Sequence, residues 1–448
     1  MRCFKRMAIT VGILVAVFAA SALPVAAEKV EVWFDAWWAP GPIVDMFKGW
    51  AEEFHEQNPD ITVKVTPGYG GQAGHALLKA IAAGTPPDVA MFDGFQMAQW
   101  VEQGAFQPLD PFIERDGYDT DDIPVGLLDE VRFGGDFYVP AGADIYGLPG
   151  FGLNVWQLMW NKDVFREVGL DPERPPMTWE ETLQYSDKIT QRDARGRLSR
   201  VGIIPWAEGY QMLAYLWGMA NEGQFISEDG TKVTCNEPRI VESYEWLLEF
   251  INRYGVDDLR RFEGGFAGPL AWGESPDCPL FVGQVGMAIE ANMTVANIRR
   301  YAPTLDYGVG PLPIPKAGMK PFTLSMGVCV TMPKGAKHPD EAWEWIKFMT
   351  SQEQWADFYN DFTAMPGSLS ASEAIMATEK DPHMTPYFEA LSYGSTCPKT
   401  PISALLYQEM LSAGELIIAL KAAPEKTLED VRAKCQAELD AILAKYSK

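Results

Sequence analysis

The stretch KVEVWFDAWWAPGPIVDMFKGWAEEFHEQNPDITVKVTPGYGGQAGHALLKAIAAGTPPDVAMF, residues 29–92, decides the fold of this chain. Its first segment alternates polar and apolar side chains, its second is rich in β-branched residues, and its third is a short apolar run after Thr85-Pro86-Pro87. The predicted strands are 29–34, 61–66 and 88–92, and the predicted helices between them are 42–57 and 72–83. Strands that alternate with short helices form βαβ units, so the sequence predicts an α/β fold with parallel strands.

The same alternation continues along the chain, in which we find no internal repeat. Thr178-Trp-Glu-Glu181 is a capping box, which marks the start of a helix. Further predicted strands are 154–160, 285–290 and 306–311, and further helices are 162–168, 239–254, 341–349, 404–422 and 428–446. We therefore expect a doubly wound, mostly parallel sheet flanked by helices, in a chain long enough for two lobes.

The N-terminus has the three parts of a secretory signal peptide. Arg2, Lys5 and Arg6 are positive, residues 8–20 are apolar, and Val25-Ala26-Ala27 resembles a cleavage site. We expect residues 1–27 to be removed near Ala27 and the mature protein to work in the periplasm. Loss of three positive charges changes the formal net charge from −24 to −27, and so acidic a surface argues against nucleic acid as a partner.

Five cysteines follow the signal peptide. Cys435 continues the apolar stripe of a predicted helix and is expected to be a buried free thiol. One disulfide could form among Cys235, Cys278 and Cys397, which lie in loop-like surroundings, but the sequence does not choose the pair. No spacing of Cys or of the four His residues resembles a metal site.

The segment Gly68-Tyr69-Gly70-Gly-Gln-Ala73 follows a predicted strand and opens a predicted helix, as a dinucleotide-binding loop does. An exported chain receives no such cofactor unless it is exported folded, and the paired arginines that direct folded export are absent from residues 1–27. A glycine turn that presents backbone N–H groups to a ligand fits better. No Gly-x-Ser-x-Gly, Walker A or His-Glu-x-x-His motif occurs, so we expect no enzyme activity and no cofactor.

Aromatic and amide-bearing loops recur at the ends of predicted strands. In open α/β sheets, ligands collect beyond the carboxyl ends of the strands. Aromatic faces pack on sugar rings, while Asp, Asn and Gln bind hydroxyl groups. The candidates for hydroxyl binding are Asp35, Asp93, Gln96, Glu290 and Asn292, the candidates for stacking are Trp37, Trp38 and Trp206, with Tyr69 and Tyr210 as further aromatic residues, and Gly70 offers backbone N–H. These loops contain almost no Arg or Lys, which argues against a phosphate or sulfate ligand.

Several blocks together resemble the solute-binding proteins of carbohydrate ABC importers, the maltose-binding-protein-like family 1. They cover nearly the whole mature chain in order. The blocks are residues 158–171 with the capping box at 178–181, FVGQVGMAIE at 281–290, LDYGVGPLP at 305–313, and HPDEAW at 338–343. One departure is Ala291-Asn292-Met293, where members often have Gly-x-Trp, and it removes an expected stacking ring.

The resemblance implies a two-lobed periplasmic-binding-protein fold with the ligand in a cleft between the lobes. Lobe 1 would comprise 28–150 and 307–350, and lobe 2 would comprise 151–306 and 351–448. Position by position, the resemblance adds Trp272 and Ser325 to the candidate ligand-binding residues. It implies a monomer that closes by hinge motion on a neutral mono- or oligosaccharide and delivers it to the ABC permease. The alternatives are a secreted carbohydrate-active enzyme, or a binding protein for glycerol phosphate or a polyol.

Overall fold

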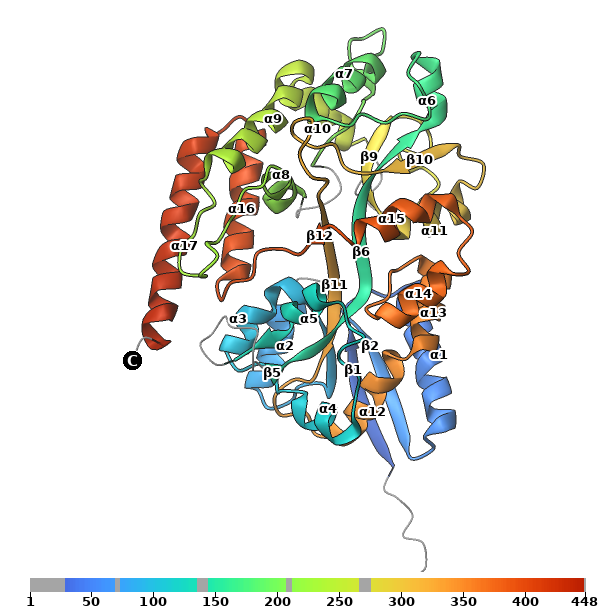
Figure 1. The fold of residues 1–448 in the computed structure, drawn as a ribbon, viewed down its shortest axis with the longest axis vertical. Coiled ribbons are helices and arrows are strands. Elements are labelled where there is room, and N and C mark those ends of the chain that lie inside the picture. The colour runs from blue at the N-terminus through green and yellow to red at the C-terminus, as the bar shows by residue number, and fades with distance from the viewer. Residues whose placement is uncertain (1–28, 69–72, 135–143, 207–211, 266–274, 447–448) are drawn as a thin grey trace, which may run out of the picture.

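The computed structural model describes residues 29–68, 73–134, 144–206, 212–265 and 275–446. Figure 1 shows an α/β protein with two bodies of helices, one above the other, joined by long strands. The strands are β1 Val30–Ala36, β2 Ile61–Pro67, β3 Val89–Asp93, β4 Arg132–Phe133, β5 Asp144–Ile145, β6 Gly147–Asn161, β7 Gln191–Arg192, β8 Leu198–Arg200, β9 Met287–Ala291, β10 Tyr307–Gly310, β11 Thr323–Thr331 and β12 Gly394–Ser395.

Helices surround these strands in both bodies. They are α1 Pro42–Gln57, α2 Ala73–Ala82, α3 Met97–Glu102, α4 Asp110–Asp116, α5 Val125–Glu130, α6 Lys162–Glu167, α7 Trp179–Ile189, α8 Trp217–Ala220, α9 Pro238–Tyr254, α10 Val256–Glu263, α11 Met293–Tyr301, α12 Pro339–Met349, α13 Gln352–Phe362, α14 Leu369–Met376, α15 Thr385–Ala390, α16 Ser403–Ile418 and α17 Pro424–Tyr446. None of the helices within the described residues is both long enough and apolar enough to cross a lipid bilayer.

The predicted α/β class and its βαβ units are confirmed. β1 pairs in parallel with β2 along its whole length and with β3 near its end. Helix α1 buries Phe47, Trp50 and Phe54 on one face, the spacing expected of an amphipathic helix. The main sheet has eight strands, in the order β10-β6-β11-β3-β1-β2, with β12 beside β11 and β9 beside β6. It is a mixed sheet and not the mostly parallel one expected, because the pairings of β6 with β9, β10 and β11 and of β11 with β3 are antiparallel.

Strands β6 and β11 join the two bodies. β11 is antiparallel to both β3 and β6, and β6 is antiparallel to β9 and β10 (Figure 1). β6 begins at Gly147 and not at the predicted Asn154. The extra residues include Gly150 and Gly152, which have positive φ, so the sequence of this part lacks the pattern of a strand. Its pairing with β11 keeps it in strand conformation.

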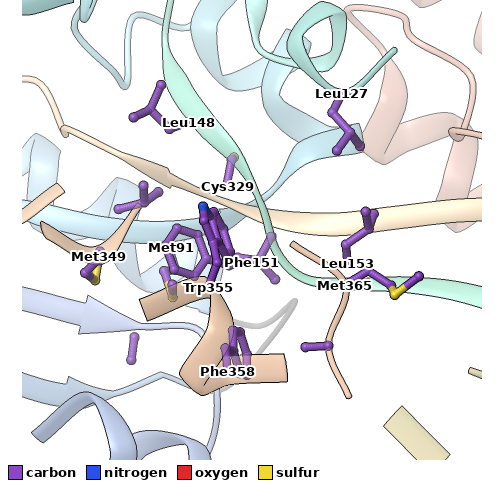
Figure 2. Close-up of a cluster of buried hydrophobic side chains, with 14 of the residues drawn as sticks. Met91, Leu127, Leu148, Phe151, Leu153, Cys329, Met349, Trp355, Phe358 and Met365 are labelled. Carbon is purple, nitrogen blue, oxygen red and sulfur yellow. The ribbon is translucent and has the colours of Figure 1, made fainter. Parts of the chain in front are cut away.

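The buried apolar residues form two clusters. The first cluster centres on β1, β3, the first half of β6 and α12, and Figure 2 shows Phe151 of β6 against Trp355 of α13, with ring centroids 4.6 Å apart. The second cluster centres on the second half of β6 with α7, α9, α16 and α17. From the segment 351–448, expected in lobe 2, residues 355–390 contribute to the first cluster and residues 397–442 to the second.

The structure tests two local expectations, the cap of α7 and the state of the cysteines. Thr178 caps α7, since its Oγ accepts a hydrogen bond from the Glu181 N–H at 3.2 Å. The five cysteines of the described residues are all buried and free. Cys435 is therefore a buried thiol as predicted, but the disulfide considered among Cys235, Cys278 and Cys397 does not form, because these residues pack as small apolar side chains in the clusters.

Candidate ligand-binding site

The carboxyl ends of β1, β2 and β3 lie at one edge of the sheet, because the three strands are parallel neighbours. Asp35 stands next to the end of β1, and Asp93 is the last residue of β3. In the register of the sheet Asp93 faces Val328 of β11, and Val328 in turn faces Phe151 of β6. The edge that the sequence predicted to carry ligand-binding residues therefore adjoins the two strands that join the bodies.

Asp35 is half-buried and lies in a short chain of hydrogen bonds. Its carboxylate accepts a bond of 3.2 Å from the Thr66 hydroxyl, and the same hydroxyl accepts 2.9 Å from the Trp33 indole N–H. Burial raises the pKa of Asp35 to about 6, and the bond from Thr66 limits the rise. Asp35 thus offers a second carboxylate oxygen as an acceptor at the sheet edge.

Asp93 and Gln96, two of the predicted ligand-binding residues, contact each other. The Gln96 amide donates to the Asp93 carboxylate at 3.1 Å. Burial raises the pKa of Asp93 to about 7, with the bond from Gln96 acting against it. A carboxylate so poorly solvated gains from a hydroxyl donor brought by a ligand.

Trp37 and Trp38 follow β1 and are half-buried against the first cluster. Trp38 packs on Phe47 and Phe358, with ring centroids 5.8 and 5.9 Å away. A Cβ at Gly152 would lie 2.8 Å from the Trp38 ring, so the indole rests directly on β6 where it passes between the bodies. Much of Trp38 is therefore used in packing.

Gly68, at the start of the glycine turn, is required by the approach of two strand ends. A Cβ there would lie 2.0 Å from the Ala36 carbonyl oxygen. The neighbouring backbone therefore imposes glycine at this position, and the presentation of N–H groups to a ligand by the turn stays a prediction. The candidates Tyr69, Gly70, Tyr210 and Trp272 lie outside the described residues.

Trp206 comes from the other body. It ends the segment 201–206, whose first residue bridges in parallel to Val285 just before β9, and it packs against the second cluster. Its side chain shares a hydrogen bond with Glu263, whose pKa is raised by burial. Trp206 therefore pairs an aromatic face with a buried carboxyl group.

Glu290 and Asn292 are fully buried. The Glu290 carboxylate accepts from the Thr294 hydroxyl at 2.7 Å. Asn292 accepts from the Val155 N–H at 2.7 Å and donates to the carbonyl oxygens of Leu153 and Thr363 at 3.2 and 2.7 Å. Both side chains are committed to protein contacts in this structure, and Asn292 ties β6 to the end of α13.

Two polar residues of the central strands complete the edge. Ser325, predicted from the family resemblance, lies on β11 opposite Val155 and is buried. Asn154, which sequence reasoning did not select, lies on β6 opposite Met326, and its buried Oδ1 has no donor among the described residues. The signal was present in the sequence, since Asn154 is the polar residue in the apolar run Leu153-Asn154-Val155-Trp156.

Glu130, at the end of α5, is another residue that the sequence did not reveal. It is buried, and one carboxylate oxygen lies 2.7 Å from where a Cβ of Gly94 would be. Burial raises its pKa to about 8, although the charge of Lys399 acts against the rise. Among the described residues, no group of three or more His, Cys, Asp or Glu side chains is placed to hold a metal ion.

Comparison with solved structures shows that other proteins share this fold. The solved structure of CpMnBP1 with mannobiose bound superposes with a TM-score of 0.80 at 26% identity, covering 91% of this chain and all of that one. The maltose/maltodextrin-binding domain MalE of Bdellovibrio bacteriovorus, bound to maltotriose, gives a TM-score of 0.72 at 17% identity, covering 92% of this chain and 100% of that chain. At that identity the second likeness shows the fold alone.

Relatives in sequence are binding proteins as well. An uncharacterised ABC transporter extracellular-binding protein of Pyrococcus horikoshii is 22% identical over 388 residues, which cover 82% of this chain and 77% of that protein. The sn-glycerol-3-phosphate-binding periplasmic protein of Salmonella paratyphi A is 28% identical over 271 residues, 59% of this chain and 56% of that protein. The family model described as bacterial extracellular solute-binding protein matches residues 41–354, well over half of the chain. This chain therefore belongs to the bacterial extracellular solute-binding protein family.

Proposed function

We propose that this protein is the periplasmic solute-binding component of an ABC importer and that its solute is a neutral mono- or oligosaccharide. The observation that carries the proposal is the combination, at one sheet edge, of the acceptors Asp35 and Asp93 with the indole rings of Trp37 and Trp38. Acceptors for hydroxyl groups and flat apolar faces are what a sugar ring needs. The likeness to a mannobiose-bound protein over 91% of the chain supports the same class of solute.

The proposed mechanism is capture between two lobes without cleavage of any bond. The lobes would comprise 28–150 with 307–350 and 151–306 with 351–448, and the packing of Phe358 of α13 on Phe47 and Trp50 of α1 favours adding that helix to lobe 1. β6 and β11 run from one cluster to the other, which suits them as hinge strands. A ligand that contacts both lobes favours the closed arrangement by its differential affinity, and the permease would recognise that arrangement.

The remaining parts of the proposal concern export and state of assembly. The positive, apolar and small-residue segments of residues 1–27 support export with cleavage near Ala27. The protein would act as a monomer, with one ligand per chain. Trp206 and Ser325 would complete the site from the side of the second cluster, with Tyr69, Gly70, Tyr210 and Trp272 as further contacts.

Glycerol phosphate is the second candidate solute, favoured by the relative from Salmonella. A phosphate requires cationic or N–H donors. The candidate residues that the structure describes at the sheet edge are carboxylates, amides, a hydroxyl and indoles, which favours the uncharged sugar.

Isothermal titration with mannobiose, maltotriose and sn-glycerol 3-phosphate tests the proposal. We expect saturable binding of at least one of the sugars and recovery of intact sugar afterwards. Trp206→Ala should weaken that binding by ~1–3 kcal/mol through loss of an aromatic contact. Tyr301→Ala, at an exposed aromatic residue of α11, is the matched control and should leave it unchanged. Binding of the phosphate alone, or release of cleaved sugar, would overturn the proposal.

A further inference from the structure

The segment that directly follows β3 makes contacts with both clusters. Met97 and Trp100 of α3 belong to the first cluster, whereas Phe95 belongs to the second. Phe95 is only two residues beyond Asp93, the acceptor of the candidate site. The segment 94–102 therefore connects the candidate site to the boundary between the two bodies.

Three contacts of different kinds link this segment to the C-terminal helices. The Phe95 ring packs edge-on against Tyr407 of α16, with centroids 5.3 Å apart. The Gln99 side-chain oxygen accepts a 3.1 Å bond from the Ala404 N–H, in the first turn of α16. Lys445 of α17 pairs with Glu102 at 2.9 Å. We call these three pairs the lobe latch.

The latch contacts are better protected than ordinary surface contacts. Phe95 and Tyr407 are more than nine-tenths buried. The Glu102 side chain is 12% exposed and the Lys445 side chain is 60% exposed, so their ion pair is shielded from solvent on the Glu102 side only. The Gln99 bond satisfies an N–H that the first turn of a helix cannot satisfy internally. Removal of one member of a pair therefore removes a contact at the boundary between the two bodies.

Glu130 of the first body also fixes the position of the segment 94–102. The Glu130 carboxylate packs on the backbone of Gly94, so tightly that a Cβ at Gly94 would lie 2.7 Å from it. Thr396, in the stretch that leads to α16, bonds to the same carboxylate. The residues on either side of Phe95 are thus held by the first body, and the ring can reach Tyr407 only while the two bodies keep this arrangement.

We propose that the lobe latch stabilises the arrangement of the two lobes that this structure has, so that Phe95, Gln99 and Glu102 set the affinity for solute without contacting it. The inference rests on the proposed function in that it takes the two bodies to be lobes that move. These three are positioning residues, since they act through the arrangement that brings Asp93 and Trp206 to one solute. Hinge motion about β6 and β11 separates the three pairs together, because all three lie between the same two bodies.

The test measures the lobes without solute. Spin labels at Glu114→Cys on α4 and Glu438→Cys on α17, both exposed positions, report the distance between the bodies, and the five buried native thiols remain unlabelled. Glu102→Gln and Phe95→Ala are each expected to add a second, separate distance to the unliganded distribution. Affinity for mannobiose should fall about threefold to tenfold for each, the range expected of one interfacial aromatic or shielded ionic pair.

A matched control separates the latch from general loss of packing. Phe106→Ala removes a ring that packs on Phe92 at 5.4 Å within the first cluster alone. It should lower stability and leave the distance distribution unchanged. In a double-mutant cycle, Glu102→Gln and Lys445→Gln should be non-additive in both distance and affinity.

The outcomes are distinct. A distance distribution that Glu102→Gln and Phe95→Ala leave unchanged overturns the latch, whatever the affinities. A new distance in both variants supports it even if mannobiose does not bind to any form, in which case only the choice of sugar is wrong.

Discussion

Asn292 offers the sharpest test of how a buried amide at the junction of the two bodies is used. Its side chain makes three hydrogen bonds, to Val155, Leu153 and Thr363, and it is fully buried. Replacement by Ala removes one acceptor and two donors; the Val155 N–H and the Thr363 carbonyl oxygen lose this partner, whereas the Leu153 carbonyl oxygen keeps a 3.3 Å bond from the Met365 N–H. A buried polar group without its partner costs about 1–3 kcal/mol, and the contributions are not fully additive. We therefore expect Asn292→Ala to lower the free energy of unfolding by about 3–5 kcal/mol.

Asn154 is the matched control for this prediction. It lies on the same strand as Val155, but its Oδ1 has no donor among the described residues. Asn154→Ala should change the free energy of unfolding by less than about 1 kcal/mol, because only a buried oxygen without a partner is lost. If Asn154 contacts the solute, the same change should weaken solute binding. The two substitutions are thus expected to have opposite profiles.

The assay is urea denaturation followed by tryptophan fluorescence and far-UV circular dichroism, at fixed protein concentration and without solute. A chain with two clusters can unfold in two steps, so the two probes must coincide before one free energy is assigned. A loss below about 1 kcal/mol for Asn292→Ala, or equal losses for both asparagines, would refute the bracing role. Asn292 would then return to the set of solute-binding candidates.

Four further predictions concern protonation, close packing and thiols. Burial raises the pKa of Asp93 to about 7, so the native state binds more protons than the unfolded state between about pH 4 and pH 7. The stability of the unliganded protein should therefore fall as pH rises through that range. Asp93→Asn should flatten this fall, as measured by thermal scans at several pH values. Solute affinity should show the opposite trend, higher at pH 8 than at pH 5.5, because ionised Asp35 and Asp93 accept hydroxyl donors better, and a pH-independent titration would count against both as contacts. Gly68→Ala should lower the free energy of unfolding by about 1–3 kcal/mol in the same denaturation assay, since the new Cβ would meet the Ala36 carbonyl oxygen. Gly84→Ala is the control: a Cβ at Gly84 would have no heavy atom within 4 Å, so only the smaller effect of its positive φ is expected. The thiol reagent DTNB should label none of the five cysteines of the mature chain in the native state and all five in urea, and rapid native labelling would contradict their burial.

The first third of the fold was predictable because local signals and long-range pairing agree there. Alternation in β1, β-branched residues in β2 and an amphipathic α1 each predict the element that forms. β11 was not predicted as a strand, and the first half of β6 was not recognised either. Both are buried on two faces, and the β6 segment is rich in glycine, so neither shows the period of two that marks a half-exposed strand. Their strand conformation is a property of the pairing between them.

The candidate site divides in the same way. Asp35, Asp93 and Trp37 were predictable, since residues that follow parallel strands must gather at one edge of a sheet. The sequence could not show that Glu290 is fully buried on β9 or that Glu130 of α5 packs on Gly94, next to Asp93. Their positions depend on partners about 100 residues away or more, such as Tyr387, whose hydroxyl bonds to the Glu290 carbonyl oxygen. Polar residue type predicts that a hydrogen bond exists and says nothing about its partner.

This distinction explains why two asparagines near the same strand need opposite interpretations. Asn292 lies in the Ala291-Asn292-Met293 segment, where family members often have Gly-x-Trp, and it was a solute-binding candidate, yet its amide bonds to backbone groups of β6 and of the end of α13. Asn154 looks like an isolated polar residue in a strand, yet its buried side-chain oxygen has no donor among the described residues. A buried acceptor without a partner is unfavourable in the unliganded protein, and a solute hydroxyl removes that penalty on binding. The polar groups that the fold leaves unsatisfied are therefore better guides to the solute than the polar groups that the sequence makes conspicuous.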